Sequence, residues 1–421
     1  MPNPLDAIQQ ANAAYVEEQY ARYRRDPSSV AGDWAAFFAG FDLGTGREGL
    51  ERVAPQAGGV YGLVLAYREF GHLVAAINPL EESRADHPPL DLVAYGLNRG
   101  DLDAAVERHP FRGPAGRTLR DLIAALRETY CGTIGVEYMD IPETRDWLQE
   151  RMESSHNRPQ LSADERIHAL RALLAADAFE QFLHVKYVGQ KRFSLEGAAS
   201  LIPMLNTLVK TAAGLGVQQV VIGMPHRGRL NVLANIMHKP LETMFSEFES
   251  SFVPADVQGH GDVKYHMGYS ALHTTRSGKR IDLDLNFNPS HLEFVNPVVL
   301  GSMRARQDYM RDLKRAHGIP VLLHGDAGFS GQGIVPETLA LAQLPAYRTG
   351  GTIHIVINNQ VGFTTSPGDA RVTRYVTDIA KVVKAPVFHV NETDPEAAVL
   401  AARLAVAYRD AFKSDAFRDL V

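Results

Sequence analysis

VLLHGDAGFSGQGIVPETLALAQLPAYRTGGTIHIVINNQVGFTT, residues 321–365, is the stretch that decides the fold of this 421-residue chain. It starts with an apolar run that stops at Asp326, passes through a glycine-rich turn and a helical segment, and ends with a β-branched run that stops at Asn358 and Asn359. Continuous apolar runs joined by a helix are typical of parallel strands that are buried on both faces. We therefore predict a βαβ unit here.

Polar side chains follow both predicted strands. Asp326 and Asn359 lie 33 positions apart, which matches one βαβ unit. Ligands of such sheets bind beyond the carboxyl ends of the strands, so we expect these two side chains to lie close together. Mg²⁺ prefers oxygen ligands and usually takes one or two protein side chains besides phosphate oxygens. The sequence therefore predicts a Mg²⁺–diphosphate site, with the backbone carbonyl of Val361 as the third protein ligand.

The turn after Asp326 supports a phosphate site, because its glycines let the backbone approach a phosphate group and a helix follows. Other phosphate motifs fit less well. A Walker loop needs a hydroxyl residue after Gly278-Lys279, where Arg280 stands. A dinucleotide fingerprint needs a different glycine spacing and an acidic residue about 20 positions further on, so NAD is disfavoured. The glycines of the turn are Gly328, Gly331 and Gly333.

Composition excludes several classes of protein. Hydrophobic residues make up 45% and charged residues 22%, which is ordinary for a globular chain that is long enough for two or three domains. A net charge of −6 gives no reason to expect nucleic acid. Cys131 is the only cysteine, so no intrachain disulfide can form, and a reducing cytoplasm fits. We find neither a secretory signal nor an apolar run near the roughly 20 residues of a membrane span.

The first part of the chain is predicted to be helical. Residues 1–42 form an arm of two short helices, which we interpret as a docking element; the alternative is that the arm folds back onto its own chain. Residues 43–60 are rich in glycine and charge and read as a flexible linker. Residues 61–190 form a helical region, whose longest helix opens with a capping box at Ser162. That helix has one apolar stripe: Ile167, Leu170 and Leu174.

From residue 191 to residue 421 strands and helices alternate, which predicts a doubly wound, mainly parallel α/β domain after the helical region and arm. Folded chains seldom end inside a core strand, so we expect that the domain is cut short at residue 421. The expected strands are Gln219–Gly223, Ile281–Phe287, Pro320–His324, Thr352–Asn358, Pro386–Val390 and Phe417–Val421.

Three histidines are candidates for contacts to a substrate. His226 and His291 each follow an expected strand, and His266 lies in the segment KYHMG. Histidine can donate to carboxylate or enolate oxygens and relay protons near neutral pH. Arg227 could pair with a carboxylate through two hydrogen bonds. Structural roles stay open for all four residues. A zinc site is disfavoured because no HExxH motif occurs.

Several segments together resemble one family, the thiamine-dependent decarboxylating component of 2-oxoglutarate dehydrogenase. The Gly325-Asp326-Ala327 turn and Asn358-Asn359 are similar to the thiamine-diphosphate motif, with Ala327 in place of its last glycine. The other segments that carry the resemblance are KRFSLEG (Lys191–Gly197), GMPHRGRLNVL (Gly223–Leu233), GDVKYHMG (Gly261–Gly268), FNPSHLE (Phe287–Glu293) and INNQVGFTT (Ile357–Thr365).

The resemblance implies thiamine diphosphate and Mg²⁺ as cofactors. His226 and His266 would be catalytic contacts to 2-oxoglutarate and its intermediates, and His291 and Arg227 would also bind the substrate. The cofactor would be bound by Asp326, Ala327, Gly328, Asn359, Gln360 and Val361, and the metal by Asp326, Asn359 and Val361.

The activity that the resemblance implies is oxidative decarboxylation of 2-oxoglutarate, the first step of the 2-oxoglutarate dehydrogenase complex in the citric acid cycle. The succinyl group would pass to a lipoyl-bearing succinyltransferase core, on which the N-terminal arm docks, and the enzyme would be a homodimer. The family activates the cofactor with a glutamate for which we find no match in this chain. Two alternatives therefore stay open: a catalytically incomplete binding module, and a related decarboxylase of another 2-oxo acid.

Overall fold

The computed structural model describes residues 13–26, 29–32, 34–35, 38, 58–81, 87–195, 197–249, 263–362 and 365–421. In the arm it contains α2 (Ala13–Arg25), close to the expected first helix. The ring of Phe38 packs on the rings of Tyr20, Tyr23 and Trp34 at centroid distances of 5.1–5.5 Å. Most of the expected second helix and of the linker at 43–60 lies outside the described residues.

The strands of the described residues form one eight-stranded sheet in the order β1-β7-β8-β6-β5-β2-β4-β3. The internal pairs are parallel, and the two edge strands β1 and β3 pair antiparallel. This arrangement confirms the predicted doubly wound, mainly parallel α/β fold. The strands are β1 (Ile134–Glu137), β2 (Gln219–Gly223), β3 (Tyr269–Thr274), β4 (Arg280–Leu285), β5 (Gly318–Gly325), β6 (Ile353–Ile357), β7 (Val387–Val390) and β8 (Ala416–Leu420).

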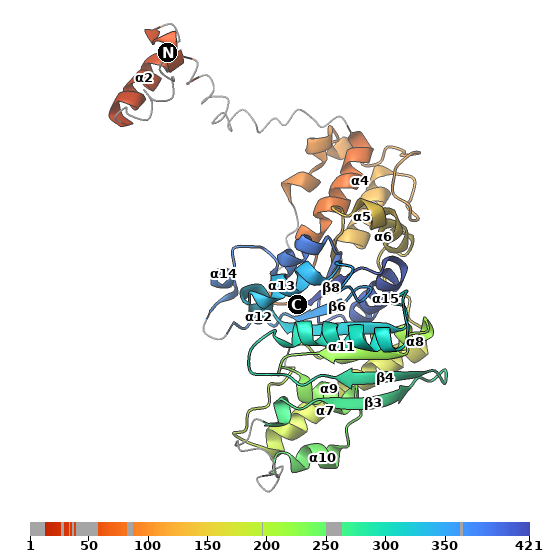
Figure 1. Ribbon diagram of the computed structural model, residues 1–421. Coiled ribbons are helices and arrows are strands. Elements are labelled where there is room, and N and C mark those ends of the chain that lie inside the picture. Colours follow the sequence, from red (N-terminus) through yellow and green to blue (C-terminus); the bar gives the residue numbers. More distant parts are fainter. Residues whose placement is uncertain are drawn as a thin grey trace.

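Helices cover both faces of the sheet because successive side chains of a strand point to opposite faces. Val321 and Leu323 of β5 join the core that contains α8 and α15, whereas Leu322 packs with Val299 of α11 on the other face. Figure 1 shows α11 running along the sheet. The helices from α8 onward are α8 (Leu201–Gly214), α9 (Arg229–Asn235), α10 (Leu241–Ser246), α11 (Val295–Tyr309), α12 (Asp326–Gly331), α13 (Ile334–Leu341), α14 (Pro367–Ala370) and α15 (Pro395–Phe412), with the 3-10 helix η8 (Val376–Val383).

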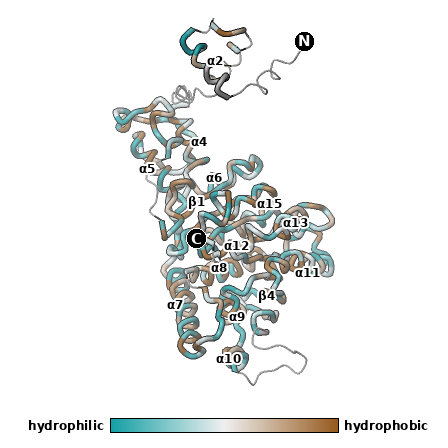
Figure 2. The backbone as a smooth tube through the Cα atoms, turned by 90° about the vertical axis from the view of Figure 1, so that its left-hand side faces the viewer, coloured by the Kyte–Doolittle hydropathy of each residue, from teal (hydrophilic) through white to brown (hydrophobic). Residues whose placement is uncertain are grey.

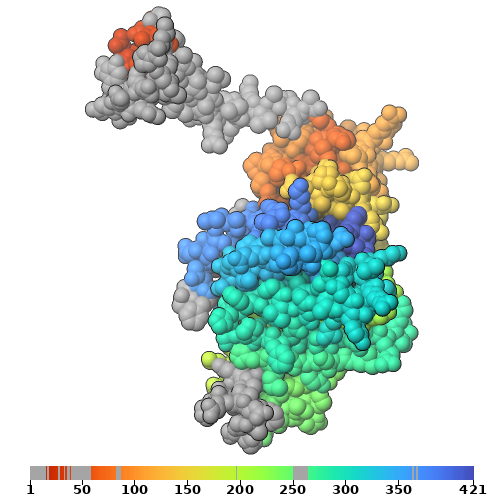
Figure 3. Space-filling model, viewed as in Figure 1, coloured from red at the N-terminus to blue at the C-terminus, as the bar shows by residue number. Residues whose placement is uncertain are grey.

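The region expected to be purely helical also supplies a strand to the sheet. It contains α4 (Gly59–Phe70), the 3-10 helix η3 (Gly71–Leu73), α5 (Leu119–Tyr130) and α6 (Pro142–Ser154), but β1 lies between α5 and α6 and pairs with β7. Figure 3 shows this region, in orange and yellow, packed against the blue segment that contains β6 to β8. The helical region is therefore continuous with the α/β core.

A buried ion pair fastens the helices of this region together. Arg68 of α4 donates to Glu153 of α6 at 2.7 Å, and both side chains are almost completely buried. The same carboxylate accepts hydrogen bonds from the Tyr130 hydroxyl at 2.5 Å and from the Arg112 backbone at 2.6 Å. The extra hydrogen bonds matter, because a buried carboxylate is stable only when its oxygens are bonded.

The long helix α7 (Ala163–Lys186) begins as predicted but buries a different face. Ser162 and Glu165 form the expected capping box. The apolar stripe is largely exposed, since Ile167, Leu170 and Leu174 keep 48%, 54% and 58% of their surface in contact with solvent. In Figure 2, brown and teal segments alternate along α7. Small residues let α7 approach α8 and α9 closely; the buried face consists of Ala169, Ala172, Ala176, Phe179 and Leu183.

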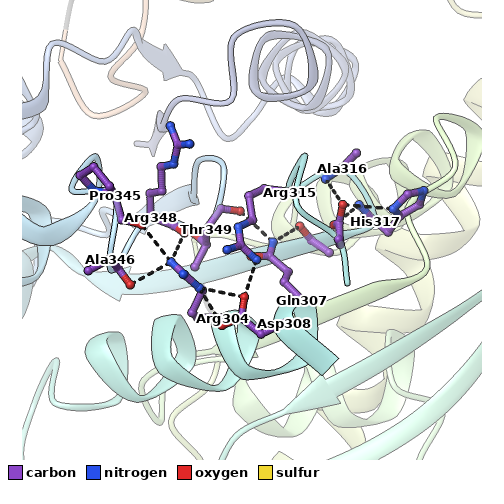
Figure 4. A network of polar contacts seen from close by, with 12 residues as sticks. Arg304, Gln307, Asp308, Arg315, Ala316, His317, Pro345, Ala346, Arg348 and Thr349 are labelled. Atoms are coloured by element: carbon purple, nitrogen blue, oxygen red, sulfur yellow. Dashed lines mark hydrogen bonds and ion pairs between the residues drawn. The ribbon is translucent and has the colours of Figure 1, made fainter. Parts of the chain in front are cut away.

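Polar side chains close the amino edge of the sheet, where β5 begins (Figure 4). Arg304 of α11 donates to the carbonyls of Pro345, Ala346 and Arg348. It also pairs with Asp308, which in turn pairs with Arg315. From the opposite face, Arg409 of α15 donates to the carbonyls of Gly318, Thr349 and Gly351. This edge therefore ties both helical layers to the same loops.

Among the described residues we find no helix with the length and apolar character needed to cross a membrane.

Candidate functional site

The predicted neighbours Asp326 and Asn359 follow adjacent strands. β5 and β6 pair in parallel up to Gly325 and Ile357. Asp326 directly follows Gly325 and begins α12, and Asn359 is the second residue after the end of β6. A Cβ on Gly362 would lie 3.9 Å from the Cβ of Ala327, so the two loops are in contact. The structure thus brings the two loops together at the carboxyl edge of the sheet, as the spacing predicts.

Asp326 has the surroundings of a carboxylate that can hold a cation. It is 7% exposed. Burial raises its pKa, although the backbone N–H of Ala327 and the positive charge of Arg371 act in the opposite direction, and the charge of Asp419 adds to the rise. An ionised carboxylate in such a place is stabilised by a bound cation. The residues present therefore fit a metal ion at this position.

The turn after β6 carries the other two predicted oxygen ligands. The Asn359 side-chain oxygen accepts a hydrogen bond from the backbone of Val361 at 3.3 Å, and an amide oxygen can accept a second contact. Gln360 has a left-handed backbone with φ of 58°. Its side chain exchanges two hydrogen bonds with Asn78, at 2.9 and 3.3 Å, which tie the turn to the helical region.

The glycine turn after Asp326 packs against a buried series of hydrogen-bonded side chains, which the sequence analysis did not predict. A Cβ on Gly328 would lie 3.2 Å from an oxygen of Glu293. That carboxylate accepts from the ring of His324 at 2.6 Å, and His324 contacts the ring of His354 at 3.0 Å. Glu293 lies in the quoted segment FNPSHLE, but nothing in that segment signals this partner on β5.

His226 and His266 come together at the ends of β2 and β3. Their rings meet edge to face at a centroid distance of 4.8 Å. The Nδ1 atom of His266 lies 2.5 Å from the carbonyl of Asn288. Because a carbonyl can only accept, Nδ1 donates, and Nε2 of the neutral ring is left to accept a proton. The pair can therefore donate to, or take a proton from, a bound molecule.

Arg229, which the sequence analysis did not single out, holds this arrangement. Its side chain is fully buried and donates to the carbonyls of Met267 and Asn286, both at 2.7 Å. Burial lowers its pKa to about 10, so it stays charged at neutral pH. Met267 directly follows His266, so the arginine fixes the loop that carries the histidine. In the sequence Arg229 stands as the only charged residue of the segment RLNVLAN, at the first position of α9.

Two other predicted residues stand apart from the histidine pair. Arg227 donates to the backbone carbonyl of Ser194 at 2.9 Å and is half-buried. His291 is exposed, and its ring packs beside Phe294 at a centroid distance of 5.7 Å. Among the contacts of the described residues, none joins His291 to His226 or His266. The contacts of the Arg227 and His291 side chains among the described residues therefore do not include the rings of His226 and His266.

All of these groups nevertheless lie along one edge of the sheet. The strands β6, β5, β2 and β4 are consecutive neighbours, and the residues that follow them include Asn359, Asp326, His226 and His291. His266 precedes β3, whose first residue pairs with the last residue of β4. The oxygen-bearing residues Asp326 and Asn359 therefore lie at one end of this edge, and the histidines lie at the other.

A cavity of about 350 Å³ adjoins the oxygen-rich end of the edge, lined by Asn358, Arg371, Tyr375, Asp419 and the segment 73–78 among others. No group of three or more His, Cys, Asp or Glu side chains in the described ranges is arranged to hold a metal. The expected ligand set does not require one, because it combines one carboxylate with an amide and a carbonyl oxygen.

Comparisons with known proteins identify the family of the chain. The family model described as dehydrogenase E1 component matches residues 171–421, and one described as 2-oxoglutarate dehydrogenase N-terminus matches residues 6–45. The multifunctional 2-oxoglutarate metabolism enzyme of Mycolicibacterium vanbaalenii is 50% identical over 368 residues, which cover 85% of this chain and 29% of that protein. The 2-oxoglutarate dehydrogenase E1 component of Cupriavidus necator is 44% identical over 451 residues, covering 97% and 47%. The chain therefore spans less than half the length of either relative.

Proposed function

The chain belongs to the dehydrogenase E1 component family, and from that premise we propose that it is the diphosphate-binding part of a thiamine-diphosphate-dependent 2-oxoglutarate dehydrogenase. The reaction would be oxidative decarboxylation of 2-oxoglutarate, followed by transfer of the succinyl group to a lipoyl-bearing partner. The observation that carries the proposal is the pairing of β5 with β6, which brings the loops of Asp326 and Asn359 together beyond one edge of the sheet.

In this proposal the carboxyl edge of β5 and β6 binds the cofactor. Asp326, Asn359 and the backbone carbonyl of Val361 would hold Mg²⁺, which requires oxygen ligands in near-octahedral geometry. Ala327, Gly328 and Gln360 would bind the diphosphate through their backbone. Thiamine diphosphate, when bound, supplies the nucleophilic carbon and the electron sink for decarboxylation.

His226 and His266 would bind the substrate at the other end of the edge. A half-buried imidazole can donate to a carboxylate when charged, and Nε2 of His266 can hold a proton because Nδ1 is bonded to Asn288. Arg227 would pair with a second carboxylate, which 2-oxo diacids have and simpler 2-oxo acids lack. His291, which is exposed, would contact the substrate from the rim.

The proposed partners are those of a multienzyme complex. The match to a 2-oxoglutarate dehydrogenase N-terminus over residues 6–45 supports a docking role of the arm on the succinyltransferase core. We also propose a homodimer. The second candidate function is a binding module without turnover, which is favoured by the lack of a match to the activating glutamate. A panel of 2-oxo acids separates the proposed substrate from related ones.

Calorimetric titration with thiamine diphosphate tests the proposed function. We expect binding in the presence of Mg²⁺ and none in excess EDTA. Asp326→Ala should lower the affinity at least about 100-fold, because removal of residues that only orient a metal ligand already costs about 10–100-fold. Asp369→Ala is the matched control, because this exposed carboxylate lies in α14, which follows the turn after β6, and accepts a hydrogen bond from the nearby Ser366. Unchanged affinity in Asp326→Ala would rule out the assigned site. Decarboxylation by the chain alone would rule out the incomplete module.

A further inference from the structure

A chain of alternating charges, largely buried except for the exposed Lys381 at one end, crosses the sheet next to the candidate site. His389 of β7 lies between two carboxylates: its Nδ1 is 3.1 Å from Asp419 of β8, and its Nε2 is 2.9 Å from Glu137 of β1. His389 is completely buried and Asp419 is 1% exposed. Lys381 pairs with the second oxygen of Glu137 at 3.2 Å. The order of charges is therefore positive, negative, positive and negative.

The remaining groups around His389 leave this charge pattern intact. The ring of Tyr375 packs on the imidazole at a centroid distance of 4.0 Å, and its hydroxyl bonds to Nδ1 of His72 at 3.0 Å. Burial alone would lower the pKa of His389, but the hydrogen bonds and charges of Asp419 and Glu137 outweigh it and raise the pKa to about 9. Both ring nitrogens therefore donate at neutral pH.

The chain of charges ends on the loop of the candidate metal site. The other oxygen of Asp419 accepts a hydrogen bond from the side chain of Asn358 at 3.1 Å. The backbone N–H of Asn358 donates to Leu420 at 2.9 Å, so both ends of this residue are fixed to β8. Asn358 is 4% exposed, and it directly precedes Asn359. The position of the turn therefore depends on where Asp419 is held.

We propose that Asp419 is a positioning residue, which His389 and Glu137 hold in place so that it orients Asn358 and thereby the oxygen ligands of Asn359 and Val361. This inference rests on the proposed function. Mg²⁺ needs near-ideal ligand geometry, so a small rotation of the turn weakens its binding. Groups that orient metal ligands typically change metal affinity 10–100-fold when they are removed.

The same strand provides a matched control at its other end. Asp415 precedes β8 and is also 1% exposed. One of its oxygens accepts a hydrogen bond from the backbone of Thr352 at 2.8 Å, and the other lies 3.6 Å from Nε2 of His354. Asp415 thus resembles Asp419 in type, burial and histidine partner. It differs in position, because it lies at the amino edge, away from the turn of Asn359.

The test compares Asp419→Asn with Asp415→Asn in the full chain, by titration with thiamine diphosphate at several Mg²⁺ concentrations. We expect Asp419→Asn to weaken cofactor binding about 10–100-fold, with recovery as Mg²⁺ is raised. Asp415→Asn should lower the melting temperature but keep the cofactor affinity within about twofold, since it is bonded only at the opposite edge. If Asp419→Asn does not fold, Asn358→Ala removes the same hydrogen bond without changing a buried charge, and the same loss is expected.

The outcomes separate the two proposals. Wild-type protein that binds thiamine diphosphate equally well with Mg²⁺ and with EDTA, or not at all, overturns the proposed function and this inference together. If the wild type binds, Asp326→Ala does not, and Asp419→Asn and Asn358→Ala bind like the wild type, only the positioning role of Asp419 is overturned. Equal losses in Asp419→Asn and Asp415→Asn, without recovery at high Mg²⁺, also overturn it, because they indicate a general loss of structure.

Discussion

The two edges of the central sheet use polar side chains in different ways. At the amino edge, Arg409 and Gln307 donate to backbone carbonyls, with Gly318 and Thr349 as shared acceptors. At the carboxyl edge, the buried groups include the carboxylate of Asp326, whose pKa is raised by burial. The first arrangement ties the chain to itself, whereas the second holds groups that gain from a ligand. On the proposed function, groups that bind a ligand therefore lie at the carboxyl edge, although Arg229 ties backbone carbonyls together there as well.

Two buried histidines differ in the direction in which their pKa is shifted. His354 on β6 contacts His324, and its nearest carboxylate, that of Asp415, lies 3.6 Å away; burial lowers its pKa. His389 on β7 has a carboxylate on each nitrogen, and its pKa is raised to about 9. Burial has the same sign in both places, so the carboxylates decide the charge state.

Arg409→Met should give the largest loss of stability, because it removes hydrogen bonds at the amino edge of the sheet. The substitution removes three hydrogen bonds from a charged donor: the carbonyl of Gly351 loses its side-chain donor, whereas those of Gly318 and Thr349 keep Gln307. Hydrogen bonds to charged groups contribute about 1.5–3 kcal/mol each, so we expect a loss of about 3 kcal/mol in the free energy of unfolding. Urea denaturation measures the loss. The affinity of the folded protein for thiamine diphosphate with Mg²⁺ should not change; a reduced affinity would contradict the separation of the edges.

Arg418→Met sharpens the comparison, because Arg418 is as buried as Arg409 but none of its guanidinium nitrogens has a hydrogen-bond partner among the described residues. Burial lowers its pKa to about 9. Replacing an uncompensated buried charge with an apolar side chain should stabilise the protein, by on the order of 2 kcal/mol. The same urea experiment checks the sign. A loss of stability in this variant would mean that Arg418, like Arg409, stabilises the folded protein.

His389→Gln should change how stability depends on pH. The folded pKa of about 9 lies above the ordinary value of 6.5, so the charged imidazole contributes its full stability below pH 6.5 and loses it as the pH rises to 9. We expect the wild type to lose up to about 1.4 kcal/mol per pH unit more than the variant over this interval. Denaturation at several pH values measures the difference. Parallel profiles for the two proteins would show that His389 is not charged in the folded state.

Much of the fold could be predicted because its strands are continuous apolar runs. All six expected strands are present: β2 has the expected bounds, and the ends of the other five differ from the expected ones by at most two residues. β1 escaped notice because a four-residue strand with a glycine, IGVE, lies among helices and pairs only with a distant strand. β3 was missed although its side chains alternate between half-buried and exposed. In α7, alanine packing against neighbouring helices outweighed the larger apolar residues.

The candidate site was predictable where the chemistry follows strand ends and not where it depends on distant partners. The spacing of Asp326 and Asn359 predicted their neighbouring strands, and the end of an expected strand led to His226, whereas His266 was singled out by the segment KYHMG. The chain from Glu137 through His389 to Asp419 joins residues up to 252 positions apart, so no local pattern could reveal it. The contact between the side chains of Gln360 and Asn78 is hidden for the same reason.

The most direct test of the central claim is a crystal structure of the chain with thiamine diphosphate and Mg²⁺. We predict one metal ion bound by the side chains of Asp326 and Asn359 and by the carbonyl of Val361, at about 2.0–2.1 Å, with diphosphate oxygens in the remaining positions. A metal and diphosphate found at any other place on the chain, with Asp326 and Asn359 unliganded, would contradict the account.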